Sequence, residues 1–189
     1  MNLWKSDFSD IQRRFPCWFT RLIRPRLVFL PAWWPVRYGA WAYCQFIFIA
    51  PGLHDAPDNV RRYLLGHEYG HIYCKHTVLH FVYWLGMAGL CSAFAVPSPL
   101  LHVGSLSVLM VVTLLACLPR LAKAREFQAD AVAVQVFGQQ VVLSGSLWMA
   151  EKAGTTANVF RQSRLRRLGW QGEAIAVVRT DVASDPGVA

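Results

Sequence analysis

The pattern of apolar and polar positions divides the chain around one long segment without charge. Residues 76–119 contain no Asp, Glu, Lys or Arg, and two apolar runs, Thr77–Val96 and Leu100–Leu118, lie within them. A helix of about 20 apolar residues is long enough to cross a hydrocarbon core of about 30 Å. Pro97-Ser98-Pro99 requires a sharp turn between the runs. The pattern therefore predicts a two-helix transmembrane hairpin (77–96 and 100–118), and the alternative is a buried helical hairpin.

The overall composition agrees with this interpretation. Hydrophobic residues make up 54% of the chain and charged residues only 16%, against about 25% charged in typical soluble domains. The formal net charge is +8, and all 19 Lys and Arg residues lie outside residues 76–119. Because positive residues gather on the cytoplasmic side of membrane proteins, we expect both flanking regions on that side. This placement also argues against nucleic acid as a partner.

The first 38 residues are basic and aromatic. Apolar side chains recur at helical spacing between Ile11 and Leu22, interrupted by Pro16. Such a segment either lies on a membrane surface with its arginines toward anionic headgroups, or packs on the domain as an ordinary helix. No apolar core of about 7–15 residues follows Met1, so we do not expect a secretory signal peptide. The five cysteines form no C-x-x-C pair and are expected to be reduced.

Extended structure is predicted for two runs of branched and aromatic residues. Leu27–Pro31 and Tyr43–Ile49 flank a segment rich in Pro, Trp and Gly, which predicts a β-hairpin or two short strands. The next element is a helix from about Asn59 to about Lys75, which begins after an aspartate-rich turn. A strand edge is therefore expected directly before this helix.

That helix contains His67-Glu68-Tyr69-Gly70-His71. Residues four apart share a helix face, so His67 and His71 can bind one metal ion together. Glu68 then lies beside the ion, where its carboxylate can accept a proton from a metal-activated water. This H-E-x-x-H pattern is typical of zinc hydrolases. The alternative is a helix that carries two unrelated histidines.

A catalytic zinc ion usually has three protein ligands and one open position. The metzincin spacing requires glycine and histidine three and six residues after His71, where this chain has Cys74 and Thr77. The third ligand is therefore expected from a later glutamate. We favour Glu126, because Asp130 follows it by one helical turn and can accept the outer N–H of a ligand histidine. The alternative is an acidic pair on the surface.

The remaining segments complete the predicted fold. After Gly138 a helix is expected over Gln139–Lys152, and residues 160–168 carry four arginines that either meet anionic lipid or form a solvated basic face. The predicted fold is mainly α with a small β-hairpin or sheet, of the α+β zincin-like type, plus the transmembrane hairpin. We expect five regions, which are the basic aromatic segment 1–38, the edge strand and H-E-x-x-H helix 39–75, the hairpin 76–119, the Glu126 helix with the C-terminal helices 120–168, and the tail 169–189.

The motif H-E-Y-G-H, the apolar hairpin and A-R-E-F-Q-A-D-A, in this order, resemble the HtpX-type membrane zinc metallopeptidases, which include the CAAX prenyl proteases. The resemblance covers about residues 39–168. It implies His67, His71 and Glu126 as ligands of one zinc ion (Zn2+), Glu68 as catalytic base, and an active site facing the cytoplasm. The N-A-F segment and the C-terminal H-P motif of that family are not found.

Together these features predict a membrane-bound zinc endopeptidase of the gluzincin type (H-E-x-x-H plus E-x-x-x-D), in the inner or cell membrane of a bacterium. Its expected partners are a protein or peptide substrate, membrane proteins included, and the lipid bilayer. In zinc peptidases a strand edge beside the metal helix commonly holds the substrate, so we predict contact at Gln45, Phe46, Ile47 and Phe48. A core strand without that role is the alternative. The alternative function is a non-catalytic, zinc-stabilised membrane protein that regulates or binds a partner, and Glu68 favours the enzyme.

Overall fold

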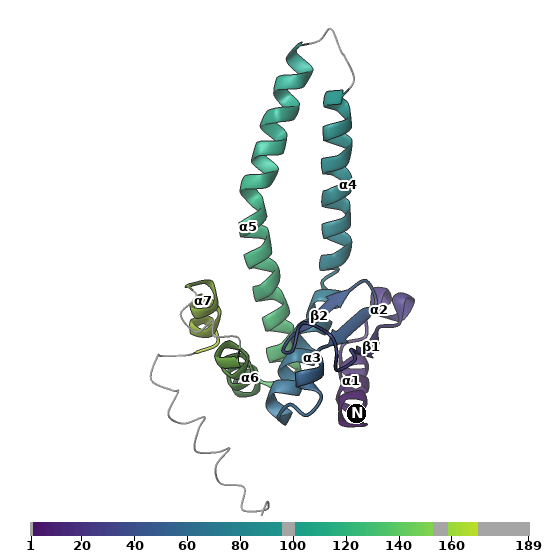
Figure 1. The fold of residues 1–189 in the computed structure, drawn as a ribbon, viewed down its shortest axis with the longest axis vertical. Coiled ribbons are helices and arrows are strands. Elements are labelled where there is room, and N and C mark those ends of the chain that lie inside the picture. Colours follow the sequence, from purple (N-terminus) through teal and green to yellow (C-terminus); the bar gives the residue numbers. More distant parts are fainter. Residues whose placement is uncertain (1, 96–100, 153–158, 170–189) are drawn as a thin grey trace, which may run out of the picture.

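The computed structural model describes residues 2–95, 101–152 and 159–169. A small body contains the sheet and most of the helices, and α4 and α5 project from it as two long arms (Figure 1). The predicted mainly helical fold with a small sheet is confirmed. The elements are α1 (Asn2–Arg14), α2 (Trp18–Ile23), β1 (Arg26–Phe29), β2 (Ala40–Tyr43), β3 (Phe46–Ile49), the 3-10 turn η1 (Pro51–Leu53), α3 (Asp58–Tyr73), α4 (His76–Ala95), α5 (Leu101–Phe137), α6 (Gln139–Lys152) and α7 (Val159–Arg167).

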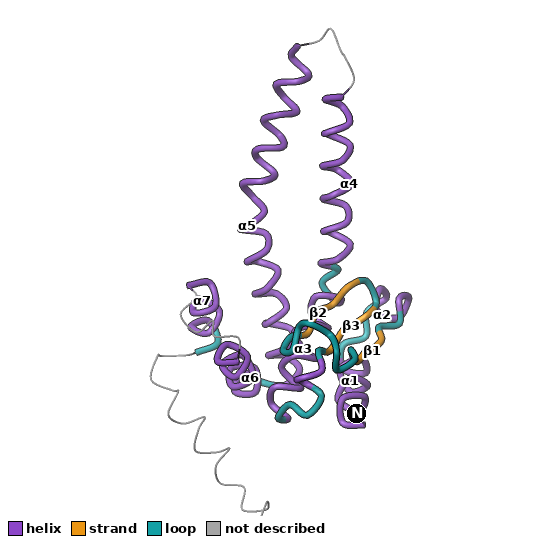
Figure 2. The backbone as a smooth tube through the Cα atoms, in the orientation of Figure 1, coloured by secondary structure: helices purple, strands orange, loops and turns teal. Residues whose placement is uncertain are grey.

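The sheet lies beside α3 (Figure 2) and has the strand order β1-β3-β2. The central strand β3 pairs in parallel with β1, where Leu27 lies opposite Ile47, and antiparallel with β2, where Ala42 lies opposite Ile47. The predicted run Tyr43–Ile49 is divided by a turn in which Cys44 has a φ of 52°. The tight hairpin is therefore β2–β3, and within the described residues the outer edge of β2 carries no further strand.

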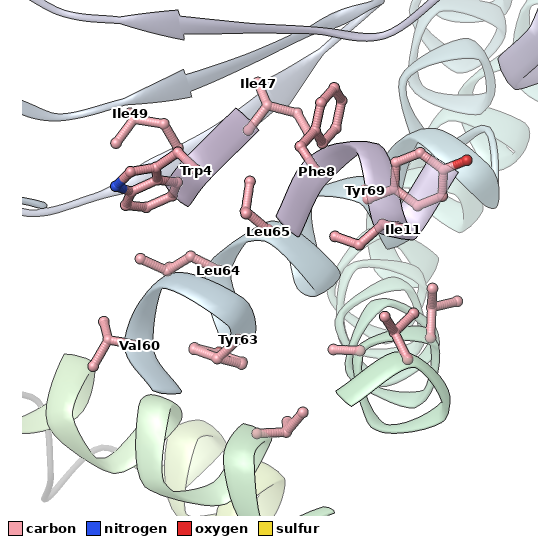
Figure 3. Close-up of a cluster of buried hydrophobic side chains, with 14 of the residues drawn as sticks. Trp4, Phe8, Ile11, Ile47, Ile49, Val60, Tyr63, Leu64, Leu65 and Tyr69 are labelled. Carbon is pink, nitrogen blue, oxygen red and sulfur yellow. The ribbon is translucent and has the colours of Figure 1, made fainter. Parts of the chain in front are cut away.

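The core lies between α1, the sheet and one side of α3 (Figure 3). Trp4 and Phe8 of α1 are buried against Ile47 of β3 and Tyr69 of α3. Helix α1 ends at Arg14, before the predicted interruption, and it packs on the body as an ordinary helix. In the short helix α2 the side chains of Trp18 and Leu22 are exposed.

The two apolar runs form helices, as predicted, but their boundaries differ. Helix α5 continues through Pro119 into the segment that carries Glu126, and forms one helix of 37 residues. None of the helices formed by the described residues combines the length and apolar character that crossing a membrane requires, so the predicted spans 77–96 and 100–118 are not supported. The predicted turn at Pro97-Ser98-Pro99 and the predicted tail beyond residue 169 lie outside the described residues.

Candidate metal centre

Helix α3 crosses the middle of the body and is buried along most of its length. It lies against α5 with almost no space between the two backbones. A Cβ atom on Gly70 would come within 2.8 Å of the Cα atom of Ala129, so only glycine fits there without a shift. Because Ala129 lies in the same part of α5 as Glu126, this close approach brings the Glu126 carboxylate to His67 and His71.

The three predicted ligands converge on one point. The Nε2 atoms of His67 and His71 are each 3.4 Å from an oxygen of Glu126, and they are 3.2 Å from each other. Three ligands about 2.0–2.1 Å from a tetrahedral zinc ion lie about 3.3–3.4 Å from one another. The spacing of this triad therefore fits a zinc ion, with the fourth tetrahedral position free of these three residues.

The electrostatics of the triad suit a cation. Burial and the neighbouring His67 lower the pKa of His71 to about 3, so its imidazole is neutral, the form that ligates a metal. Burial also lowers the pKa of His67, but Tyr63 and the acidic neighbours Asp130 and Glu126 outweigh that effect and raise it well above its usual value. A position between these side chains therefore favours positive charge.

Asp130 lies where its predicted role requires. Its Oδ1 atom is 2.9 Å from Nδ1 of His67, on the side of the ring that faces away from the triad. A carboxylate in this position orients the ligand and fixes its tautomer. Burial raises the pKa of Asp130, but hydrogen bonds from His67 and Arg164 reverse this effect and hold it at about 2. The carboxylate therefore stays ionised at neutral pH.

Arg164 of α7 is a site residue that the sequence reasoning missed. Its guanidinium donates to both oxygens of Asp130, at 2.8 and 2.7 Å, and to Oε2 of Glu126 at 2.8 Å. The side chain is buried, whereas the sequence suggested lipid or solvent around this segment. A signal was present, because Arg164 lies four residues from both Phe160 and Leu168 and so shares their apolar helix face.

Glu68 lines the same cavity as the triad and is buried. Burial raises its pKa to about 7, against the opposing effects of His67 and of a hydrogen bond from the backbone of Ala42. A general base is most effective when its pKa lies near the working pH. Because Ala42 belongs to β2, the sheet edge also helps to hold this carboxylate.

The predicted substrate segment requires a correction. Phe46, Ile47 and Phe48 belong to the central strand β3, whose two edges are both paired, so a substrate strand cannot be added there. The outer strands of the sheet are β1 and β2, and of these two β2 lines the cavity that contains the triad. The Gly39 carbonyl accepts a hydrogen bond from the Ala50 amide. In an antiparallel pair, successive residues direct their backbone N–H and C=O groups alternately toward and away from the partner strand, so those of Ala40 point away from β3.

Two cavities meet at the metal centre. The first, of about 550 Å³, is lined by the edge strand β2 and by His67, Glu68, His71 and Glu126. The second, of about 640 Å³, shares His71 with the first and has a mostly apolar lining. Gln45 lines this second cavity together with Phe46, so contact of these two residues with a substrate side chain stays a prediction.

Comparison with known proteins identifies one family. The model of peptidase family M48 matches residues 38–154. The matched segment runs from the start of the β2 edge to the end of α6 and includes all three residues of the triad, but it ends before Arg164. Comparison with curated proteins and with solved structures finds no match.

Proposed function

Because the chain belongs to peptidase family M48, a family of zinc-dependent metallopeptidases, we propose that it is an endopeptidase that cleaves peptide bonds within protein substrates. One observation carries the proposal. The ligand atoms of His67, His71 and Glu126 have the mutual spacing of a tetrahedral zinc site, and the Glu68 carboxylate lies in the same cavity.

In this proposal the residues of the site have separate roles in hydrolysis. A bound zinc ion, held by His67, His71 and Glu126, supplies a Lewis acid that polarises the scissile carbonyl and acidifies the attacking water. Glu68 accepts a proton from that water while the water oxygen bonds to the carbonyl carbon. It then delivers the proton to the amide nitrogen as the C–N bond breaks and the amine leaves. Arg164 keeps the Glu126 carboxylate turned toward the histidines through its hydrogen bond to Oε2.

The free edge of β2 aligns the substrate in this proposal. The backbone of Ala40 faces outward by the alternation described above and lies in the lining of the cavity that contains Glu68. A substrate in extended conformation pairs with this edge, as peptides do when they add a strand to a sheet. The adjoining apolar cavity then accepts a large apolar side chain near the scissile bond, which favours apolar protein segments as substrates.

The location at the cytoplasmic face of a membrane is also part of the proposal. Six large apolar side chains of α4 between Val78 and Leu85 are 42–66% exposed, and groups of exposed apolar side chains commonly mark contacts with lipid or protein. All 19 Lys and Arg residues lie outside residues 76–119. In this proposal the apolar hairpin contacts the bilayer, and the basic body with its active site remains on the cytoplasmic side.

The experiment that tests the enzymatic function replaces Glu68 by Gln. We expect Glu68→Gln to bind one zinc ion per chain like the wild type, because it removes none of the three ligands. Cleavage of casein should fall by about 10²–10⁴-fold, the usual contribution of a general base. Glu151→Gln is the matched control, because this glutamate is exposed on α6, and it should leave cleavage unchanged.

Two outcomes would contradict the proposal. If Glu68→Gln keeps full cleavage, Glu68 is not the base. If the wild type binds zinc but cleaves neither casein nor membrane-protein substrates, the alternative of a non-catalytic zinc-stabilised membrane protein takes the place of the enzyme.

A further inference from the structure

The two histidines of the triad have different partners on their outer nitrogens. His67 meets the carboxylate of Asp130, but Nδ1 of His71 lies 2.7 Å from Nδ1 of His76. The other ring nitrogen of His76, Nε2, lies 2.9 Å from Oε1 of Gln128. A chain of two hydrogen bonds therefore leads from His71 through a buried imidazole to a side chain of α5.

The direction of these hydrogen bonds follows from the last group in the chain. The Oε1 atom of Gln128 can only accept, so the Nε2 atom of His76 must carry the proton. Because a neutral imidazole has one donor and one acceptor, Nδ1 of His76 then accepts from Nδ1 of His71. This leaves the lone pair of His71 on Nε2, the atom that faces His67 and Glu126.

The backbone brings His76 into this position through a sharp bend. Helix α3 ends at Tyr73 and α4 begins at His76. Between them Lys75 has a φ of 59°, in the left-handed region that residues other than glycine seldom adopt. The bend turns the chain so that the first residue of α4 lies against the last turn of α3.

From this geometry we infer that His76 and Gln128 are positioning residues, which fix the tautomer and ring orientation of the metal ligand His71. The inference rests on the proposed zinc site but not on peptide cleavage. His76 is not itself a ligand in this arrangement, because both of its ring nitrogens are engaged by His71 and Gln128. Helices α4 and α5 thus both contribute to the metal centre in this way, with His76 from α4 and Gln128 from α5.

The test measures the zinc affinity of the full chain by competition with a chelator. Loss of an outer hydrogen-bond partner typically weakens metal binding by about 10–100-fold, and we expect a loss in this range for His76→Phe. His76→Gln should recover most of the affinity, because an amide supplies one acceptor for His71 and one donor for Gln128. His80→Phe is the control, since His80 also belongs to α4 but accepts a hydrogen bond from Trp84 of the same helix, and it should leave zinc affinity unchanged.

A second variant keeps the inference testable if His76→Phe does not fold. Gln128 is exposed on α5, so Gln128→Leu should leave the melting temperature of the metal-free protein near that of the wild type and still weaken zinc binding. Wild-type affinity in both His76→Phe and Gln128→Leu would overturn the inference. Equal losses in His76→Phe and His76→Gln would also overturn it, because they would show that the ring only fills space. Neither readout involves cleavage, so a failure here is distinct from a failure of the proposed peptidase activity.

Discussion

At the scale of single residues, Arg164 holds together two carboxylates that would otherwise repel each other in a buried place. Its guanidinium contacts Asp130 and Glu126 at 2.7–2.8 Å. Burial alone lowers the pKa of this guanidinium, but the nearby Tyr63, Asp130 and Glu126 raise it above its usual value, so it remains charged. The positive charge of Arg164 therefore stabilises the site before any metal binds.

Replacing Arg164 by Leu should destabilise the metal-free protein by about 3 kcal/mol, because it removes the charged partner of the buried Asp130 carboxylate and of the half-buried Glu126 carboxylate. Arg166→Leu is the matched control, since Arg166 lies two residues further along α7 and is exposed, and exposed positions usually change stability by less than about 0.5 kcal/mol. Denaturant unfolding of both metal-free variants measures the difference. Equal losses in the two variants would show that Arg164 does not stabilise the carboxylates.

The residues of the site differ in how far the sequence could predict them. The pairs His67/His71 and Glu126/Asp130 each lie four residues apart on one helix, so local spacing was enough to group them. Arg164 reaches Asp130 across 34 residues and Glu126 across 38, and no local rule links such positions. His76 could not be linked to His71 from the sequence for another reason, because their contact depends on the bend at Lys75.

At the scale of elements, the metal centre depends on the contact between α3 and α5. Gly66 and Gly70 leave room for a close neighbour, and the structure places Ala133 and Ala129 of α5 against them. The sheet was harder to predict, because the sequence pattern indicates the strands but not their order in the sheet. The parallel pairing of β1 with β3 joins residues 20 apart. It makes β3 the central strand, so an outer edge beside the triad is offered by β2 and not by β3.

Gly70→Ala should force α3 and α5 apart, because the new Cβ atom would lie within 3 Å of backbone atoms of Ala129. Overpacking of this kind typically costs about 1–3 kcal/mol of stability, and we expect zinc affinity to fall as well, since the two helices carry different ligands. Gly86→Ala on α4 is the control, because a Cβ atom there meets nothing within 4 Å.

Thermal unfolding and zinc titration of both glycine variants measure these effects. Gly86→Ala should be neutral or slightly stabilising, as alanine has the higher helix propensity. Unchanged stability and zinc affinity in Gly70→Ala would show that the close approach of α3 and α5 is not required.

At the scale of the whole molecule, the charged residues and the apolar hairpin occupy different parts of the chain, because all 19 Lys and Arg residues lie outside residues 76–119. Helix α4 projects from the body (Figure 1), and its part between Val78 and Leu85 carries exposed apolar side chains. The run without charge is visible in the sequence itself, whereas its contact with a bilayer stays a proposal. The sequence did not indicate that the second apolar run and the Glu126 segment form one helix. In the structure α5 continues without a break from the hairpin to the metal centre.

The proposed membrane contact predicts that the purified chain floats with vesicles that contain anionic lipids in a density gradient. The double variant Val82→Asp/Leu85→Asp should reduce flotation strongly, because it places two charges on the exposed apolar face of α4. Leu3→Asp/Trp33→Asp is the matched control, since both side chains are exposed outside the hairpin, and it should float like the wild type. Equal flotation of the two variants would contradict the proposed contact.

The place of Arg164 in the chain also has a consequence for biosynthesis. Its guanidinium meets His67 across 97 residues and Asp130 meets the same ring across 63. At about 5–20 residues per second, a ribosome needs about 5–20 s to add that length of chain. Glu126, the third residue of the triad, follows His67 by 59 residues, and Arg164 follows Glu126 by a further 38 residues. Because synthesis starts at the N-terminus, we expect the contacts of Arg164 with Asp130 and Glu126 to form only after α7 has emerged, when all three residues of the triad are already present.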